Sequence, residues 1–162
     1  MAYADYSFYT GSFFGDVLTE QNANKWLELA SDELDNLTFG RLTFAFPEKE
    51  AHIAKVKKAV CAVAEALFNI DAQRKATAAT VAADGTYRGA IASVSSGRES
   101  ISYSAGNASA STYAAAAASE AEQSKLIGSI AVKYLANIPD CNGVNLLYAG
   151  EVRHVPQHNN PV

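Results

Sequence analysis

The chain has 162 residues, of which 49% are apolar and 19% charged, and its formal net charge is -4. This length and composition are those of a single globular domain that buries a sizeable core. The net negative charge and the dispersed basic residues argue against a protein that binds nucleic-acid phosphates. Two cysteines are too few for a disulfide scaffold. No apolar run reaches the ~18–20 residues of a membrane span, so no membrane partner is expected.

The N-terminal segment, residues 1–18, is rich in aromatic residues separated by Gly and Ser, a pattern that predicts an irregular arm. Aromatic side chains are costly to leave in water, so we expect the arm to pack on another surface. That surface belongs either to the same domain or to a neighbouring subunit. The aromatic residues of the arm are Tyr3, Tyr6, Phe8, Tyr9, Phe13 and Phe14.

Apolar residues at helical spacing predict three helices. The first begins at Thr19, a suitable N-cap, and stops near Gly40. The second, about residues 48–70, has the clearest periodicity, and such a stripe is far more typical of a core than of a cofactor site. The third spans about 112–137, although the capping-box spacing of residues 119–122 offers a later start. The stripe of the second helix comprises Ile53, Val56, Val60, Val63 and Leu67.

Residues 71–111 separate the second and third helices and are rich in Ala, Ser, Thr and Gly. At the centre of the 91–103 stretch, Ser95-Ser96-Gly97 favours a turn, and Val94, Ile101 and Tyr103 add strand character. This pattern predicts a β-hairpin or an extended loop. Towards the C-terminus, residues 144–155 alternate enough to predict a strand or an extended tail.

The predicted fold is therefore mainly α and forms one domain over residues 1–162. It has a three-helix bundle-like core, a central β-hairpin or extended loop, and extended N- and C-terminal arms. The predicted parts are an arm at 1–18, a helical core at 19–142 with an insertion at about 71–111, and a tail at 143–162.

The sequence offers no catalytic, cofactor-binding or metal site, and we expect no enzyme. It lacks a Gly-x-Ser-x-Gly nucleophile elbow, a phosphate-binding glycine loop and a Cys-x-x-Cys pair. His154 and His158 have the spacing of a helical metal pair, but Pro156 between them argues against a helix. Glu65 lies at the edge of an apolar stripe, where it is either a catalytic carboxylate or, more typically, a structural one paired with a partner.

Several stretches of the chain follow one another in an informative order. They are the arm with Tyr9 and Gly15, residues 30–40 followed by Arg41, residues 57–65, the Ser/Gly segment followed by Tyr103, the helix ending in Tyr134 and Leu135, and residues 146–150. In this order they resemble the head–tail connector (adaptor) proteins of long-tailed bacteriophages and prophages. The resemblance covers most of the chain and rests on order and spacing, since no single stretch is specific. The chain departs from the pattern at Ala149, where a basic residue is usual, and in its longer alanine run at 114–118.

The resemblance implies a structural virion protein that forms a dodecameric ring beneath the portal protein and joins the DNA-filled capsid to the neck and tail. One face would dock on the portal, and the other on a neck, stopper or tail-completion protein. DNA would pass through the lumen of the ring without sequence-specific binding. The net acidity of the chain suits such a lumen, because each contact of Lys or Arg with a phosphate adds an electrostatic attraction that slows the passage of DNA. The expected location is the head–tail interface of a virion assembled in the host cytoplasm.

We expect the arm, the Ser/Gly segment and the tail to contact neighbouring subunits or partners. Three alternatives stay open: a stopper or head-completion protein one layer below, a small cytoplasmic helical enzyme, and a DNA-binding accessory protein. The predicted contact residues are Tyr6, Tyr9, Phe13, Phe14, Val94, Ser96, Arg98, Ile101, Tyr103, Leu147, Tyr148 and Arg153.

Overall fold

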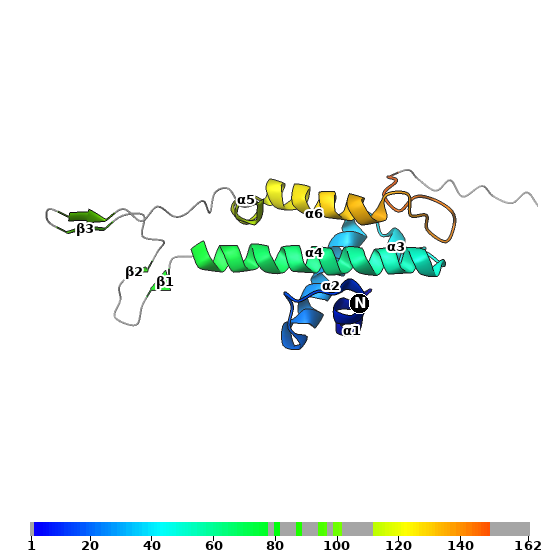
Figure 1. Ribbon diagram of the computed structural model, residues 1–162. Helices are drawn as coiled ribbons and strands as arrows, with labels where there is room; N and C mark the ends of the chain where they lie inside the picture. Colours follow the sequence, from blue (N-terminus) through cyan, green and yellow to red (C-terminus); the bar gives the residue numbers. More distant parts are fainter. Residues whose placement is uncertain are drawn as a thin grey trace, which may run out of the picture.

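The computed structural model describes residues 2–77, 80–81, 87–88, 94–96, 99–101 and 112–149. The fold is mainly helical, as the sequence predicts, and three long helices dominate it (Figure 1). The helices are α1 (Tyr6–Phe8), the π-helix η1 (Tyr9–Phe13), α2 (Glu20–Leu37), α3 (Arg41–Phe44), α4 (Glu50–Thr77), α5 (Thr112–Ala118) and α6 (Glu120–Leu135).

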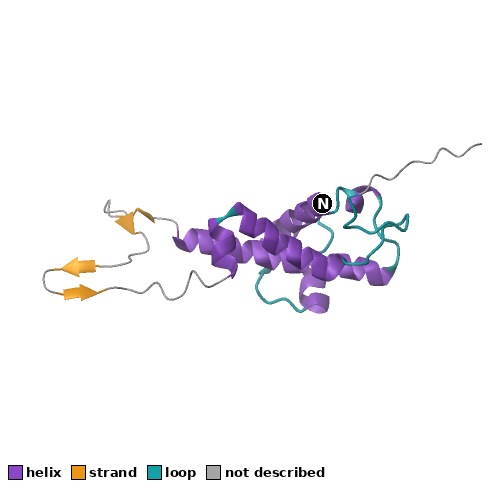
Figure 2. Ribbon diagram, turned by 90° about the horizontal axis from the view of Figure 1, so that it is seen from above, coloured by secondary structure: helices purple, strands orange, loops and turns teal. Residues whose placement is uncertain are grey.

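Helix α4 is the axis of the fold, and both other long helices pack against it. α6 runs antiparallel alongside α4, while α2 crosses α4 and also contacts α6 (Figure 1). Seen from above, the helices form one bundle (Figure 2). Because α4 is covered from more than one direction, residues beside the predicted stripe, such as Ala59 and Ala64, are buried as well.

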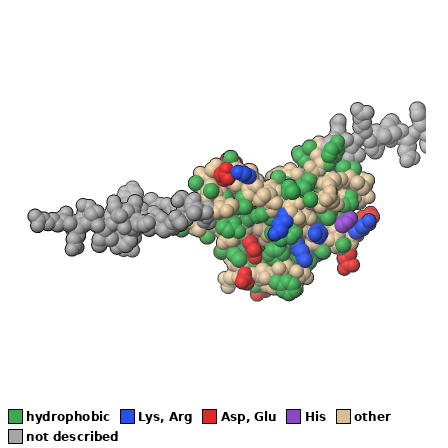
Figure 3. All heavy atoms as spheres, turned by 45° about the horizontal axis from the view of Figure 1, so that its top comes forward, with side chains coloured by type: hydrophobic (Ala, Val, Ile, Leu, Met, Phe, Trp, Pro, Cys, Tyr) green, Lys and Arg blue, Asp and Glu red, His purple; other side chains and the backbone are tan. Residues whose placement is uncertain are grey.

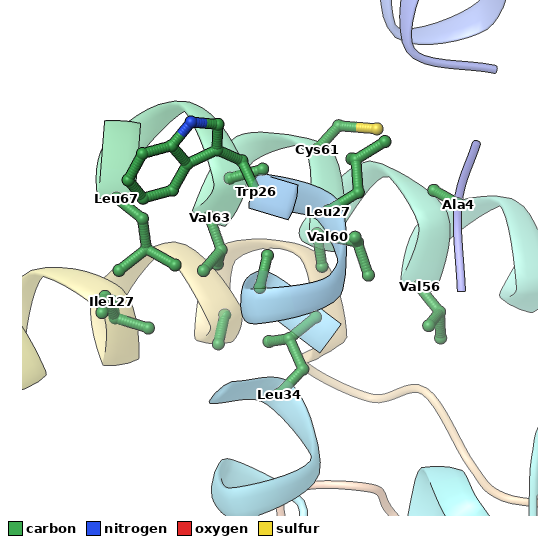
Figure 4. Packing of buried hydrophobic residues seen from close by; sticks show 14 of the residues in the cluster. Ala4, Trp26, Leu27, Leu34, Val56, Val60, Cys61, Val63, Leu67 and Ile127 are labelled. Carbon is green, nitrogen blue, oxygen red and sulfur yellow. The ribbon is translucent and has the colours of Figure 1, made fainter. Parts of the chain in front are cut away.

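The core lies where the three long helices meet (Figure 4). The predicted stripe is the face that α4 buries, since Val56, Val60 and Val63 are fully buried. Leu27 of α2 packs into the same cluster and is also fully buried. Each such side chain contributes about 1.5–3 kcal/mol relative to an exposed one, so this junction is a principal source of stability.

The third predicted helix is divided in two at Ser119. This residue has an extended backbone (φ -141, ψ 128) and forms the N-cap of α6, while α5 ends one residue earlier. The alanine run at 114–118 does form a helix, and the capping-box spacing marks a second start. Both predicted beginnings are therefore confirmed, as the starts of two separate helices.

Arg74, near the C-terminal end of α4, joins this helix to α5 and α6. Its Nε donates to the carbonyl oxygen of Ala117 at 3.2 Å, and its Nη2 donates to Oε1 of Gln123 at 2.6 Å. The Ala117 carbonyl belongs to the last turn of α5, where a cation is favourable. The contact therefore holds the C-terminal end of α4, which ends at Thr77, against α5 and α6, the first of which begins at Thr112.

The prediction of an extended N-terminal arm is wrong. Asp5 caps α1 by accepting from the backbone N–H of Phe8 at 2.8 Å, and the chain continues directly into η1. Ala4 and Tyr9 are buried in the common core. The segment therefore packs on its own domain, which is one of the two surfaces that the aromatic content predicted.

The start of the predicted C-terminal tail is also part of the packed fold, contrary to an extended conformation. Leu146 is fully buried, and its N–H donates to the carbonyl oxygen of Ile138 at 2.9 Å. The backbone of Cys141 donates to that of Ala45 at 3.3 Å, which ties this segment to the end of α3. Residues 150–162 of the predicted tail lie outside the described residues.

Between α4 and α5 in the sequence, the described residues include four short strands. They are β1 (Thr80–Val81), β2 (Tyr87–Arg88), β3 (Val94–Ser96) and β4 (Glu99–Ile101). β1 pairs with β2, and β3 pairs with β4, both antiparallel. Most of residues 78–111 lies outside the described residues, so the β-hairpin expected around Ser95-Ser96-Gly97 stays a prediction.

Candidate interaction surfaces

The hydroxyl group of Tyr9 ties the N-terminal segment to α4. It donates to Oε1 of Glu65 at 2.7 Å and accepts from the backbone N–H groups of Val17 and Leu18 at 2.9 and 3.0 Å. Burial raises the pKa of Tyr9 to about 12, with the Glu65 carboxylate adding to the effect and the two N–H donors opposing it. Of the two interpretations of Glu65, the structure supports the paired structural carboxylate.

Gly15 is required by the position of the Tyr9 ring. A Cβ atom built on Gly15 would overlap that ring, which lies directly against the glycine backbone. The N–H of Gly15 also donates to the carbonyl oxygen of Tyr9 at 3.0 Å, closing the turn after η1. The two residues of the arm that carry the resemblance are thus in direct contact.

The predicted aromatic contact residues of the arm are brought together by the structure. The rings of Tyr6 and Tyr9 stack at 6.1 Å between centroids, and those of Tyr9 and Phe13 at 5.9 Å. Tyr9 is a core residue, whereas Tyr6 and Phe13 are half-buried. Only Phe14 stands out from the surface, with 81% of it exposed.

Among the described residues other than glycine, three have a left-handed backbone: Phe14 (φ 61), Phe39 (φ 55) and Asn137 (φ 64). Asn tolerates this conformation, but for a bulky residue it costs roughly 1–2 kcal/mol. Phe39 occupies the position after the C-cap of α2 that is usually Gly, because the N–H of Gly40 donates to Asp35 and that of Phe39 to Asn36. α2 therefore ends at Leu37, before the predicted stop at Gly40.

Exposed aromatic side chains gather on and beside α3. Phe39, Phe44 and Tyr148 are 58%, 67% and 61% exposed, and the ring of Phe44 lies over Gly40. We call these three residues the α3 aromatic surface. Tyr148 was predicted from the sequence as a contact residue, whereas Phe39 and Phe44 were not. The signal that could have indicated them was a phenylalanine next to the predicted end of the first helix.

A buried ion pair supports this surface from beneath. Nη1 of Arg41 lies 3.3 Å from Oδ2 of Asp140, and both side chains are almost completely buried. Nε of Arg41 donates to the carbonyl oxygen of Tyr148 at 3.2 Å. Oδ1 of Asp140 accepts from the N–H groups of Asn142 and Val144. The pair thereby fixes the backbone that presents Tyr148 next to α3.

A hollow of about 350 Å³ opens between α2 and the C-terminal half of α4. Trp26 and Leu29 of α2 and Leu67 and Ile70 of α4 form its apolar wall, and Leu29 is 41% exposed. The rest of the lining is polar and of mixed charge: it comprises Lys25, Asp32, Glu33, Asp71, Arg74 and, from α6, Gln123. We call this feature the α2–α4 hollow.

On the face shown in Figure 3, basic and acidic side chains are interspersed. Among the lysines of α4, Lys55 is exposed, while Lys57 and Lys58 are half-buried. The ammonium group of Lys57 lies 5.3 Å from the centroid of the Phe8 ring, so it packs on the N-terminal segment.

The other predicted contact residues are less well placed by the structure. Leu147 is half-buried against the core. Val94, Ser96 and Ile101 are in β3 and β4, for which the backbone pairing alone is described. Arg98, Tyr103 and Arg153 lie outside the described residues.

The titratable groups of the described residues are not gathered into a metal site: no three His, Cys, Asp or Glu side chains there could hold an ion together. Cys61 is buried, and burial raises the pKa of its thiol to about 12, with the nearby Glu65 carboxylate adding to the effect. Cys141 is free as well and exposed. In the part of the chain that is described, no helix has both the length and the apolar character needed to cross a membrane.

Comparisons of the chain with protein-family models, with curated proteins and with solved structures gave no match.

Proposed function

We propose that this protein is a head–tail connector (adaptor) subunit of a long-tailed bacteriophage or prophage. It would form a dodecameric ring beneath the portal protein and join the DNA-filled capsid to the neck and tail. In this proposal the subunit is a bundle of three main helices, and the insertion between the second and third of them carries a central β-hairpin.

One observation carries the proposal: the residues that carry the sequence resemblance are those that hold the helical fold together. Tyr9 and Gly15 are in contact, and Tyr9 is hydrogen-bonded to Glu65 in the third matching stretch. Gly40 links α2 to α3, and Arg41 forms the buried ion pair with Asp140. The groups of a reaction centre lie together in one place, whereas these residues are spread over the contacts between helices, as in a structural protein.

The surface of the described residues also supports an assembly protein. The α3 aromatic surface and Phe14 place large apolar side chains in water, and such exposure is a feature of interaction sites. The interspersed charges of the face in Figure 3 are not those of a phosphate-binding groove. These features favour a structural protein that binds other proteins over the alternative of a DNA-binding accessory protein.

The test is to mix the purified protein with purified portal and to examine the product by electron microscopy and native mass spectrometry. A closed ring seated on the portal is the expected product. A strict monomer that does not bind portal contradicts the proposal, and a DNA affinity that falls steeply with salt would favour the DNA-binding accessory protein instead. A ring that binds only a preformed portal–connector complex would identify the stopper alternative.

A further inference from the structure

The tight turn at residues 140–144 contains a dipeptide that can react without an enzyme. Asn142 is followed by Gly143, and no other asparagine of the chain precedes a glycine. Asparagine is a chemically labile residue, because the backbone nitrogen of the next residue can attack its side-chain amide. Glycine hinders that attack least, since it has no Cβ. Both residues are exposed, and a Cβ built on Gly143 would meet no described atom within 4 Å.

The reaction needs water and no other reagent. The nitrogen of Gly143 loses its proton and attacks Cγ of Asn142, so that a new C–N bond forms. The bond from Cγ to the amide nitrogen breaks, and ammonia leaves with the proton. Water then opens the cyclic imide at one of its two carbonyl groups. One opening gives aspartate on an ordinary backbone, and the other gives isoaspartate, whose main chain is longer by one carbon atom.

The same turn is built on the buried side chain of Asp140. Oδ1 of Asp140 accepts from the N–H groups of Asn142 and Val144 at 2.8 and 2.9 Å. Oδ2 of the same carboxylate lies 3.3 Å from Nη1 of Arg41 in the buried ion pair. Because both N–H groups reach one oxygen, the main chain between them has a fixed length. An extra carbon at residue 142 pulls one of these donors away, and a buried carboxylate that loses a donor is costly.

We propose that Asn142 is a site of spontaneous deamidation, and that its isoaspartate product loosens the ion pair of Arg41 and Asp140. The N–H of Gly143 donates to the carbonyl oxygen of Asp140 at 3.1 Å, so the turn must open before the nitrogen attacks. Opening of the turn therefore permits the reaction, and the isoaspartate product then keeps the turn open. The inference does not depend on the connector function, and its failure leaves that proposal unchanged.

The site is tested by incubating the purified protein at mildly alkaline pH and mapping its peptides by mass spectrometry, with fragmentation that separates isoaspartate from aspartate. Asn137 is the internal control, because it is exposed with a left-handed backbone but is followed by the β-branched Ile138. We expect conversion at Asn142 to be at least about tenfold faster than at Asn137. Comparable rates at the two residues would overturn the site, as would an Asn142 that is still an amide after the urea-unfolded chain has reacted.

The effect of the product on the ion pair is tested by stability. The isoaspartate form is separated from the aged protein by chromatography and unfolded in urea. Freshly prepared Asn142→Asp is the matched control, because it has the new charge on an ordinary backbone. We expect the isoaspartate form to unfold at a lower urea concentration than this control, and equal midpoints would overturn the link between the backbone change and the pair.

The reverse effect, of the ion pair on the reaction, is tested by rate. Arg41→Lys keeps the charge but loses the contact of Nε with the carbonyl oxygen of Tyr148, and we expect it to deamidate at Asn142 several-fold faster than the wild type. Tyr9→Phe, which weakens the fold away from the turn, should react at the wild-type rate. An unchanged rate in Arg41→Lys overturns the link, and so does an equal acceleration in both variants, which would indicate global unfolding.

Discussion

The hydroxyl group of Tyr9 donates a 2.7 Å hydrogen bond to Glu65, and this bond joins the N-terminal segment to the middle of α4. The same oxygen accepts from the backbone at Leu18, where the chain is buried just before α2 begins. One side chain therefore satisfies three polar groups, the Glu65 carboxylate and the N–H groups of Val17 and Leu18, which belong to two separate parts of the fold. The N-terminal segment is as much a part of the core as the long helices are.

We predict that Tyr9→Phe lowers the free energy of unfolding by about 1–3 kcal/mol. The substitution keeps the ring but leaves the N–H groups of Val17 and Leu18 and the Glu65 carboxylate without their partner, and unsatisfied buried groups are costly. Urea unfolding measures the change. Tyr6→Phe is the matched control, since the Tyr6 ring stacks on the same neighbour from a half-buried position. Equal stabilities for the two variants would contradict a special role for the Tyr9 hydroxyl.

Alkaline pH is predicted to destabilise the protein through two tyrosines. Burial raises the pKa of Tyr9 to about 12, and burial together with the Asp35 acceptor raises that of Tyr3 to about 12, although the hydrogen bond with Thr43 opposes this. Because both values lie above the ordinary 10.0, the native state holds these protons more tightly than the unfolded chain does. The stabilisation is complete below pH 10.0 and is lost as the pH rises towards 12.

Thermal unfolding measured between neutral pH and pH 11–12 checks this dependence, which spans the ordinary tyrosine pKa and the raised one. The Tyr9→Phe variant should lose less stability over the alkaline part of the range than the wild type does. A Tyr9→Phe variant with an alkaline loss identical to that of the wild type would show that Tyr9 does not contribute.

Gly15→Ala is predicted to destabilise the fold by about 1–3 kcal/mol, because the added methyl group would overlap the ring of Tyr9 and force it to shift. Gly11→Ala is the control, since a Cβ there meets no atom within 4 Å and Ala is favoured over Gly in a helix. Denaturant midpoints should therefore move in opposite directions, or only the Gly15 variant should change. A Gly15→Ala protein as stable as the wild type would refute the close contact.

Arg41→Met is predicted to cost about 3–5 kcal/mol, because it leaves the carboxylate of Asp140 buried without its counter-ion. The exposed pair of Lys125 and Glu122, 3.8 Å apart on α6, provides the control. Lys125→Met should change the free energy of unfolding by no more than about 0.5 kcal/mol. Similar effects at the two sites in urea unfolding would mean that burial of the Arg41 pair has no consequence.

The long helices could be predicted from sequence because large apolar residues recur at helical spacing on the face that α4 buries, as Val56, Val60 and Val63 show. The N-terminal segment could not, because α1 and η1 are too short to show a period and are held by the distant Glu65. The break at Ser119 was visible only as a second capping signal inside a strong helical pattern.

The interaction surfaces were predicted in part, and the failures have physical causes. Tyr9 was expected at a contact because it is aromatic and lies in a polar segment, yet the fold uses it as core. Phe39 and Phe44 were missed because an aromatic residue next to a helix end ordinarily predicts burial. The partner of Arg41 is 99 residues away, so no local pattern could show that its charge is buried.

The contact that Arg74 makes with Ala117 and Gln123 has a consequence for how this chain can vary. It joins the end of α4, which closes at Thr77, to α5, which begins at Thr112, so the two ends of the intervening segment are held near one another by groups of the core. Closing a shorter or longer connection between fixed ends changes the loop entropy only slowly with length. We therefore expect that the segment between Thr77 and Thr112 can be shortened or lengthened while the helical core keeps its fold.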